Sequence, residues 1–171
     1  MFCVNDTVMY GNSGVCTIVD IRPEKFGAEE VLYYILKPVY HERSTIYCPV
    51  DNEKIKIRSL LSKQEVYDLI QLMPDAQTQW IENEQQRKQQ FNILLKNGSH
   101  EDLVRLIKTI YLNRDEKAKA GKKFHAADER VMKEAEALLY EELAHVLHIE
   151  PDEVVGFIAG QLKPDQEAKQ A

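Results

Sequence analysis

The spacing of apolar positions changes near residue 60 of this 171-residue chain. Before that point, apolar and polar residues alternate in short runs rich in β-branched side chains, a pattern typical of half-buried strands. The predicted strands are Thr7–Tyr10, Val15–Ile21, Val31–Lys37, Ser44–Pro49 and Lys54–Arg58. Glycine, asparagine and aspartate residues mark tight turns between them. Five short strands in so short a stretch predict a small, strongly bent antiparallel barrel of the SH3-like kind, which leaves an edge exposed.

Beyond residue 60 the apolar spacing follows the 3.6-residue period of a helix. Ser62 and Glu65 predict a capping box, in which each side chain accepts a hydrogen bond from the other residue's backbone amide. Ser99 and Asp102 predict a second helix start of the same kind, directly after a left-handed helix end at Asn97-Gly98. Helices are predicted over residues 62–73, 77–96, 99–119 and 127–147, with a short last helix from residue 150.

The two patterns together predict an α+β protein. A small SH3-like antiparallel β barrel is expected over residues 1–60 and an all-α helical domain over residues 61–162. Residues 163–171 are predicted to form a polar tail. The boundary falls where strand periodicity gives way to the first capping box.

The single tryptophan, Trp80, lies at the start of the second predicted helix, in a highly charged stretch. An indole beside water commonly marks a contact with something outside the chain. The alternative interpretation is a tryptophan that packs on its own helical neighbours, which periodicity alone favours.

Hydrophobic residues make up 44% of the chain. No apolar run in it reaches the roughly 18 to 20 residues that a membrane span requires. The N-terminus shows no basic leader or apolar signal segment, so we expect a cytoplasmic protein. Cys3, Cys16 and Cys48 include no C-x-x-C pair and are expected to be reduced.

The formal charge of −6 is unevenly distributed along the chain. Residues 85–133 carry a net charge of +6, whereas residues 134–171 carry −7. A basic block can be a solvated helical face or a surface that binds phosphates. The candidate phosphate contacts are Arg87, Lys88, Arg114, Lys117, Lys119, Lys122, Lys123 and Arg130.

Catalysis has no candidate constellation in this sequence, which lacks a phosphate-binding glycine loop, a nucleophile elbow and paired cysteines. Glu141, Glu142, His145 and His148 have the helical spacing of metal ligands, but a third ligand group is missing. We interpret them as a solvated helical face and expect no enzyme activity, metal or cofactor. A remaining alternative is an RNA-associated or ribosome-associated factor that uses the basic helical block.

Several segments resemble a known family. Residues 6–10, 14–21, 33–36 and 46–49 resemble the RNA polymerase-interacting domain of the CarD and CdnL transcription regulators, a domain that also occurs in transcription-repair coupling factor. In the helical half, Trp80-Ile81, Arg87-Lys88, Asn97-Gly98 and residues 103–113 and 135–144 resemble the regulators specifically. The resemblance covers about residues 2–149.

This resemblance implies a factor whose barrel docks on the β subunit of RNA polymerase, while its helical domain contacts promoter DNA without reading sequence. The implied role of Trp80 is a wedge in the minor groove at the upstream edge of the transcription bubble. By their positions on strand ends and turns, the candidate polymerase contacts are Arg22, Lys25, Arg43 and Tyr47. A monomer is favoured.

Overall fold

The computed structural model describes the backbone of residues 1–41 and 44–170, and the side chains of residues 1–41 and 44–162. The chain divides into two compact units, Met1–Leu60 and Leu61–Ala171, each with a hydrophobic core of its own. Within these described ranges, five strands in the first unit and five α-helices in the second confirm the predicted α+β class. Within the described residues, no helix is both long enough and apolar enough to cross a membrane.

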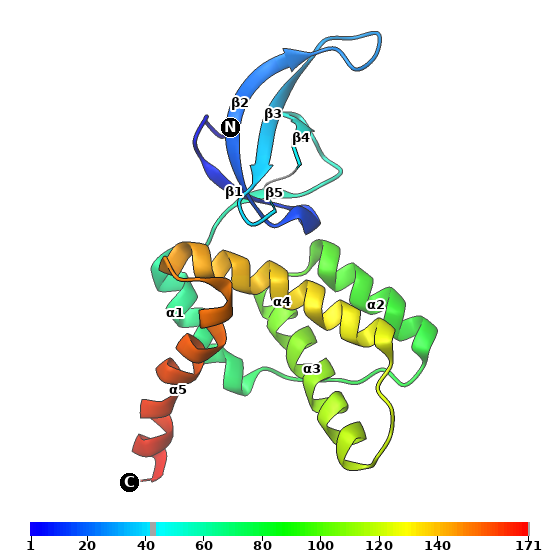
Figure 1. Cartoon of the computed structure of the whole chain (residues 1–171), viewed down its shortest axis with the longest axis vertical. Coiled ribbons are helices and arrows are strands. Elements are labelled where there is room, and N and C mark those ends of the chain that lie inside the picture. Colours follow the sequence, from blue (N-terminus) through cyan, green and yellow to red (C-terminus); the bar gives the residue numbers. More distant parts are fainter. Residues whose placement is uncertain (42–43, 171) are drawn as a thin grey trace. The chain divides into compact units, whose positions relative to one another are not determined.

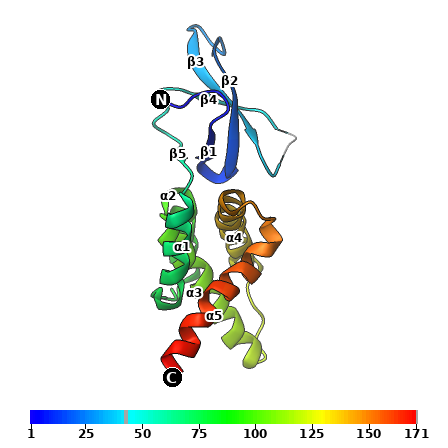
Figure 2. The same cartoon turned by 90° about the vertical axis from the view of Figure 1, so that its left-hand side faces the viewer.

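The first unit is a five-stranded antiparallel sheet with the strand order β4-β3-β2-β1-β5 (Figure 1). A β-bulge between Ile18 and Asp20 bends the long ribbon of β2 and β3, whose curvature is visible in Figure 2. The turn from β1 to β2 needs glycine because Gly11 and Gly14 have φ values of 44° and 74°. The strands are β1 (Thr7–Tyr10), β2 (Val15–Glu24), β3 (Val31–Pro38), β4 (Ile46–Pro49) and β5 (Ile57–Ser59).

The sheet packs a small core of Val8, Ile18, Tyr34, Leu36 and Cys48 with their neighbours. Across the described residues no ladder joins β4 to β5, so these two strands are the edges of the sheet. The predicted exposed edge is therefore present, and closure of the sheet into a barrel is not observed in this part of the chain.

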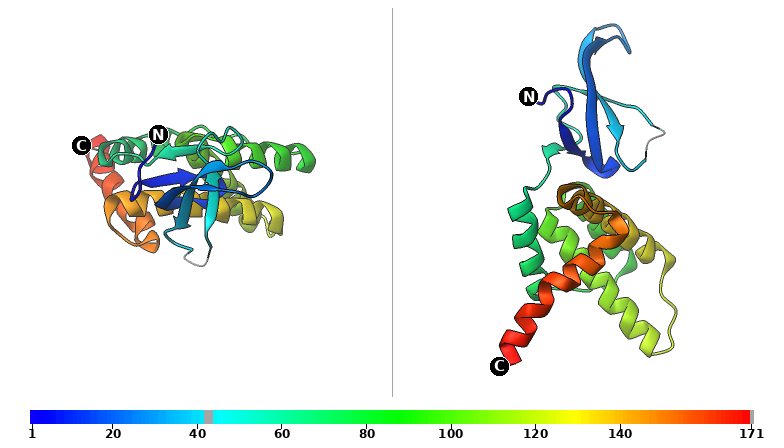
Figure 3. Two further views of the ribbon diagram at one scale, coloured as in Figure 1. Left: turned by 90° about the horizontal axis from the view of Figure 1, so that it is seen from above. Right: turned by 60° about the vertical axis from the view of Figure 1, so that its left-hand side comes forward.

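The second unit is a helical bundle in which α3 and α4 pack together and α2 lies beside α4 (Figure 1). Helix α5 crosses α1 on one side of the bundle (Figure 3, right), where the Tyr67 and Phe157 rings are 6.0 Å apart. Both predicted capping boxes are present, at Ser62 with Glu65 and at Ser99 with Asp102. The helices are α1 (Lys63–Leu72), α2 (Glu84–Asn97), α3 (His100–Lys119), α4 (Ala126–Leu147) and α5 (Val154–Gln170).

Three local predictions for this unit were wrong. Helix α2 begins at Glu84 after an Asn83 cap instead of near Gln77, so Trp80 lies in an extended connection. Gly98 follows α2 with φ −64° and ψ 149°, so this helix end is not left-handed. The last helix was predicted to be short, but α5 runs for 17 residues, from Val154 to Gln170.

Candidate functional site

Trp80 lies in the connection of residues 76–83, which follows the short 3₁₀ turn Met73–Asp75 after α1 and leads to the start of α2. The indole is half-buried and packs against the helical core. Its ring meets the ring of Phe91 edge to face, with centroids 6.2 Å apart. The Trp80 indole is thus partly packed and partly exposed. Its packed part matches the interpretation as a packing residue, and its exposed part matches the interpretation as a contact with something outside the chain.

Arg87 lies beneath this indole, with its guanidinium carbon 4.5 Å from the ring centroid. The side chain is only 3% exposed, and its Nε and Nη2 donate to the two carboxylate oxygens of Asp128 at 3.1 and 3.0 Å. Nη1 donates to the backbone carbonyls of Ile81 and Glu82 at 2.9 and 3.2 Å. The structure therefore removes Arg87 from the predicted phosphate contacts, because its donors are enclosed and already engaged.

Lys117, near the end of α3, is a second predicted phosphate contact that lies beside the tryptophan. Its ammonium nitrogen is 5.5 Å from the Trp80 ring and 5.6 Å from the Phe124 ring. Phe124 directly follows Lys122 and Lys123 in the loop between α3 and α4. Figure 1 shows this loop at the end of the bundle where α2 and α4 begin. Trp80, Lys117 and the two loop lysines therefore occupy one end of the helical unit.

The remaining predicted phosphate contacts lie in different environments. Lys119 pairs with Asp115 at 2.8 Å on the surface, and this partner raises its pKa. An exposed cationic side chain that makes no ion pair with any described residue can replace solution counterions on a phosphate backbone. Among the predicted phosphate contacts, four residues meet this description: Lys88, Lys122, Lys123 and Arg130.

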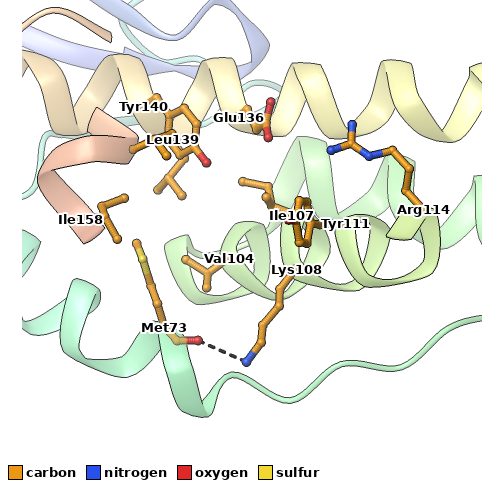
Figure 4. Close-up of a pocket in the computed structure, with 11 residues that line it drawn as sticks. Met73, Val104, Ile107, Lys108, Tyr111, Arg114, Glu136, Leu139, Tyr140 and Ile158 are labelled. Atoms are coloured by element: carbon orange, nitrogen blue, oxygen red, sulfur yellow. Dashed lines mark hydrogen bonds between the residues drawn. The ribbon is translucent and has the colours of Figure 1, made fainter. Parts of the chain in front are cut away.

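Arg114 contacts different residues from Lys117, although both belong to α3. It lines an apolar pocket of about 330 Å³ between α3, α4 and α5, with its guanidinium on the side of Glu136 (Figure 4). The guanidinium carbon is 5.5 Å from the Tyr111 ring centroid. Burial raises the pKa of Glu136, while Arg114 opposes that rise, and burial raises the pKa of Tyr140 to about 12. Arg114 thus contacts the wall of the pocket and is not one of the side chains around Trp80.

The predicted polymerase contacts in the β unit lie mostly on its surface. Arg22 is exposed and pairs with Asp20 at 2.9 Å and Glu24 at 2.6 Å, and hydrogen bonding by Glu24 raises its pKa. Lys25 is exposed in the turn that follows β2. Arg43 lies outside the described residues.

Tyr47 belongs to an exposed aromatic cluster, which we define as Phe26, Tyr33 and Tyr47. The Phe26 ring meets Tyr33 and Tyr47 at centroid distances of 5.3 and 5.1 Å, and Tyr33 and Tyr47 are 6.5 Å apart. All three contacts are edge to face. Phe26 is 65% exposed and Tyr47 is 40% exposed. This cluster adjoins the edge strand β4, so an apolar contact and a sheet edge are available together.

Sequence patterns predicted only one member of this cluster. Phe26 lies in a charged turn, where an aromatic side chain is not expected. An aromatic residue at such a position is the sequence signal that could have identified it. Asp128 carried no signal at all, because its partner Arg87 is 41 residues away.

The expected solvated face at Glu141, Glu142, His145 and His148 was wrong for the two glutamates. Glu142 is 1% exposed, and its carboxylate accepts from the backbone amide of Leu61 at 2.9 Å and meets Nε2 of His100 at 2.8 Å. Glu141 is also buried. His148 is exposed and closes α4 in a left-handed conformation, whereas burial lowers the pKa of His145. Glu142 therefore links α4 to the chain just before α1 and to the start of α3. Within the described residues, no cluster of three or more histidine, cysteine, aspartate or glutamate side chains could hold a metal ion.

A comparison with protein families agrees with these features of the β unit. The model of the family described as the CarD-like/TRCF RID domain matches residues 2–61, which include all of the first unit except Met1. No curated protein matches the chain. The chain therefore carries, as its N-terminal unit, a CarD-like RNA polymerase-interacting domain of the kind shared with transcription-repair coupling factor.

Proposed function

We propose that this protein is a non-catalytic transcription regulator that binds the β subunit of RNA polymerase and stabilises the open promoter complex. The family match over residues 2–61 is the observation that carries the proposal. The polymerase would bring the protein to the nucleoid in the cytoplasm.

The aromatic cluster and the edge strand β4 form the proposed docking surface. An edge strand accepts a strand of a partner through backbone hydrogen bonds, and an adjacent aromatic side chain anchors the contact in an apolar pocket. Phe26 and Tyr47 supply that anchor because both rings are exposed beside the edge. The lobe of the β subunit is the proposed partner.

The end of the helical unit that holds Trp80 is the proposed DNA contact. Lys88, Lys117, Lys122 and Lys123 would bind phosphates, which requires no base recognition and makes the contact independent of sequence. The exposed part of the indole would enter the minor groove where duplex meets bubble. Since a relaxed duplex does not offer that junction, the contact favours the open state over the closed one.

The test separates docking from open-complex stabilisation. A fragment that ends at Leu60 should bind the isolated lobe of the β subunit, because the compact unit ends there and the family match ends one residue later. The full chain should lengthen the life of promoter open complexes, and the fragment should not. Binding by the helical fragment alone would reverse these roles.

A further inference from the structure

The connection of residues 76–83 has no regular secondary structure, yet backbone carbonyls in it and in the short 3₁₀ turn before it, Met73–Asp75, are bound by side chains of the surrounding helices. Lys108 of α3 donates to the carbonyls of Pro74 at 2.6 Å and Ala76 at 3.0 Å. Arg87 of α2 donates to those of Ile81 and Glu82. Trp80 is therefore flanked by two points at which long side chains fix the chain.

The second of these points also contacts the indole. The Arg87 guanidinium lies 4.5 Å from the ring centroid of Trp80 and binds the two residues that follow it. Its remaining bonds form a two-pronged pair with Asp128 of α4. The side chains of this pair are only 4% and 8% exposed, so water does not compete strongly for either ion.

We propose that Arg87 and Asp128 position Trp80, and that Arg87 affects open-complex stability through the orientation of the indole and not through a phosphate. The inference rests on the proposed function of Trp80. Asp128 orients the guanidinium through two parallel bonds, which fix both its position and its plane. The oriented guanidinium then presents one face to the indole and two donors to the adjoining backbone.

The substitution Arg87→Lys distinguishes a positioning role from a phosphate contact. Lysine keeps the charge and binds phosphate well, so a phosphate contact would survive the change. A single ammonium cannot form the parallel pair with Asp128, stack on the indole and bind two carbonyls. Asp128→Asn is the second variant, since it disturbs the same arrangement without altering any cation. Lys88→Gln is the matched control, because Lys88 is exposed and adjacent in sequence.

Trp80 is the only tryptophan, so intrinsic fluorescence of the full-length protein reports this site alone. In Arg87→Lys and Asp128→Asn we expect a shifted emission maximum and stronger acrylamide quenching at temperatures where circular dichroism shows both variants folded. With promoter-bound polymerase, the open-complex lifetime should fall towards that of Trp80→Ala, about tenfold. Its dependence on salt should stay unchanged. Lys88→Gln should show unchanged fluorescence and a smaller salt slope.

Unchanged fluorescence in Arg87→Lys and Asp128→Asn would overturn the positioning role, as would a normal lifetime in variants whose fluorescence has changed. If Trp80→Ala itself leaves the lifetime unchanged, the proposed function fails instead, while the fluorescence result still decides whether the pair fixes the indole.

Discussion

Arg87 and Asp128, which are 41 residues apart in sequence, meet in two parallel hydrogen bonds inside the helical unit. The pair joins α2 to α4 directly beneath Trp80. Because both side chains are almost fully enclosed, removal of either one leaves a buried charge without its partner.

We therefore expect Arg87→Ala or Asp128→Ala to lower the free energy of unfolding of the helical unit by about 3–5 kcal/mol. Urea unfolding followed by Trp80 fluorescence measures this quantity for that unit alone. Lys133→Ala is the matched control, because Lys133 and Glu129 form an exposed pair at 3.7 Å that should contribute less than about 0.5 kcal/mol. Equal losses in the buried and exposed pairs would contradict this assignment.

The aromatic cluster predicts a separation of binding from stability. Phe26→Ser and Tyr47→Ala should each weaken polymerase binding by about tenfold or more, as expected for exposed aromatic anchors of an interface. Phe26 is 65% exposed, so its loss should barely change the melting temperature. Titration against the β-subunit lobe, with Val4→Ser as an exposed apolar control, measures the effect. A similar loss of binding in the control would exclude a specific role for the cluster.

The basic loop predicts a change in salt dependence. Lys122→Gln combined with Lys123→Gln should reduce the log-log slope of DNA affinity against salt concentration by about two, one for each phosphate that the protein no longer neutralises. Arg114→Gln should leave the slope unchanged, because Arg114 lies beside Glu136 and Tyr111 at the pocket. The slope is measured with promoter-bound polymerase at several salt concentrations. A reduced slope in Arg114→Gln and an unchanged slope in the double lysine variant would instead place the DNA on the side of the pocket.

The carboxyl group of Glu136 should make the folded protein less stable as pH rises. Burial raises its pKa above the ordinary value of 4.5, so the folded protein keeps a proton that the unfolded chain has already released. Stability therefore falls as pH increases through this window, and Glu136→Gln should raise the melting temperature at pH 7 but not below about pH 4.

Glu65→Gln is the control, because it should change the melting temperature at pH 7 in the opposite direction. The Ser62 amide lowers the pKa of Glu65, so its contribution is present above the unfolded pKa and is lost in acid. This variant should melt earlier than the natural protein at pH 7 and together with it in acid. If the melting temperature at pH 7 changed in the same direction in both variants, that result would contradict the opposite pKa shifts of Glu136 and Glu65.

The features predicted correctly from the sequence depend on residues that are close along the chain. Both capping boxes join residues three positions apart, and a hairpin strand such as β1 pairs with its immediate successor. The signals for such elements lie within a few residues, so they are readable without a tertiary structure.

The features missed depend on distant partners. Nothing local prevents residues 77–83 from continuing a helix, but Lys108 and Arg87 bind carbonyls in and beside that segment from α3 and α2. Glu142 was predicted to face solvent because its partners, Leu61 and His100, are 81 and 42 residues away. For the same reason Arg87 was assigned to phosphate binding, since Asp128 gave no sign of pairing with it.

The most direct measurement is the lifetime of promoter open complexes with Trp80→Ala, made beside the binding of the same variant to the β-subunit lobe. If the indole acts at the bubble edge, the lifetime should fall by about tenfold while lobe binding and the fold are retained. A lifetime equal to that of the natural protein, in a variant whose circular dichroism shows it folded, would contradict the proposed role of Trp80.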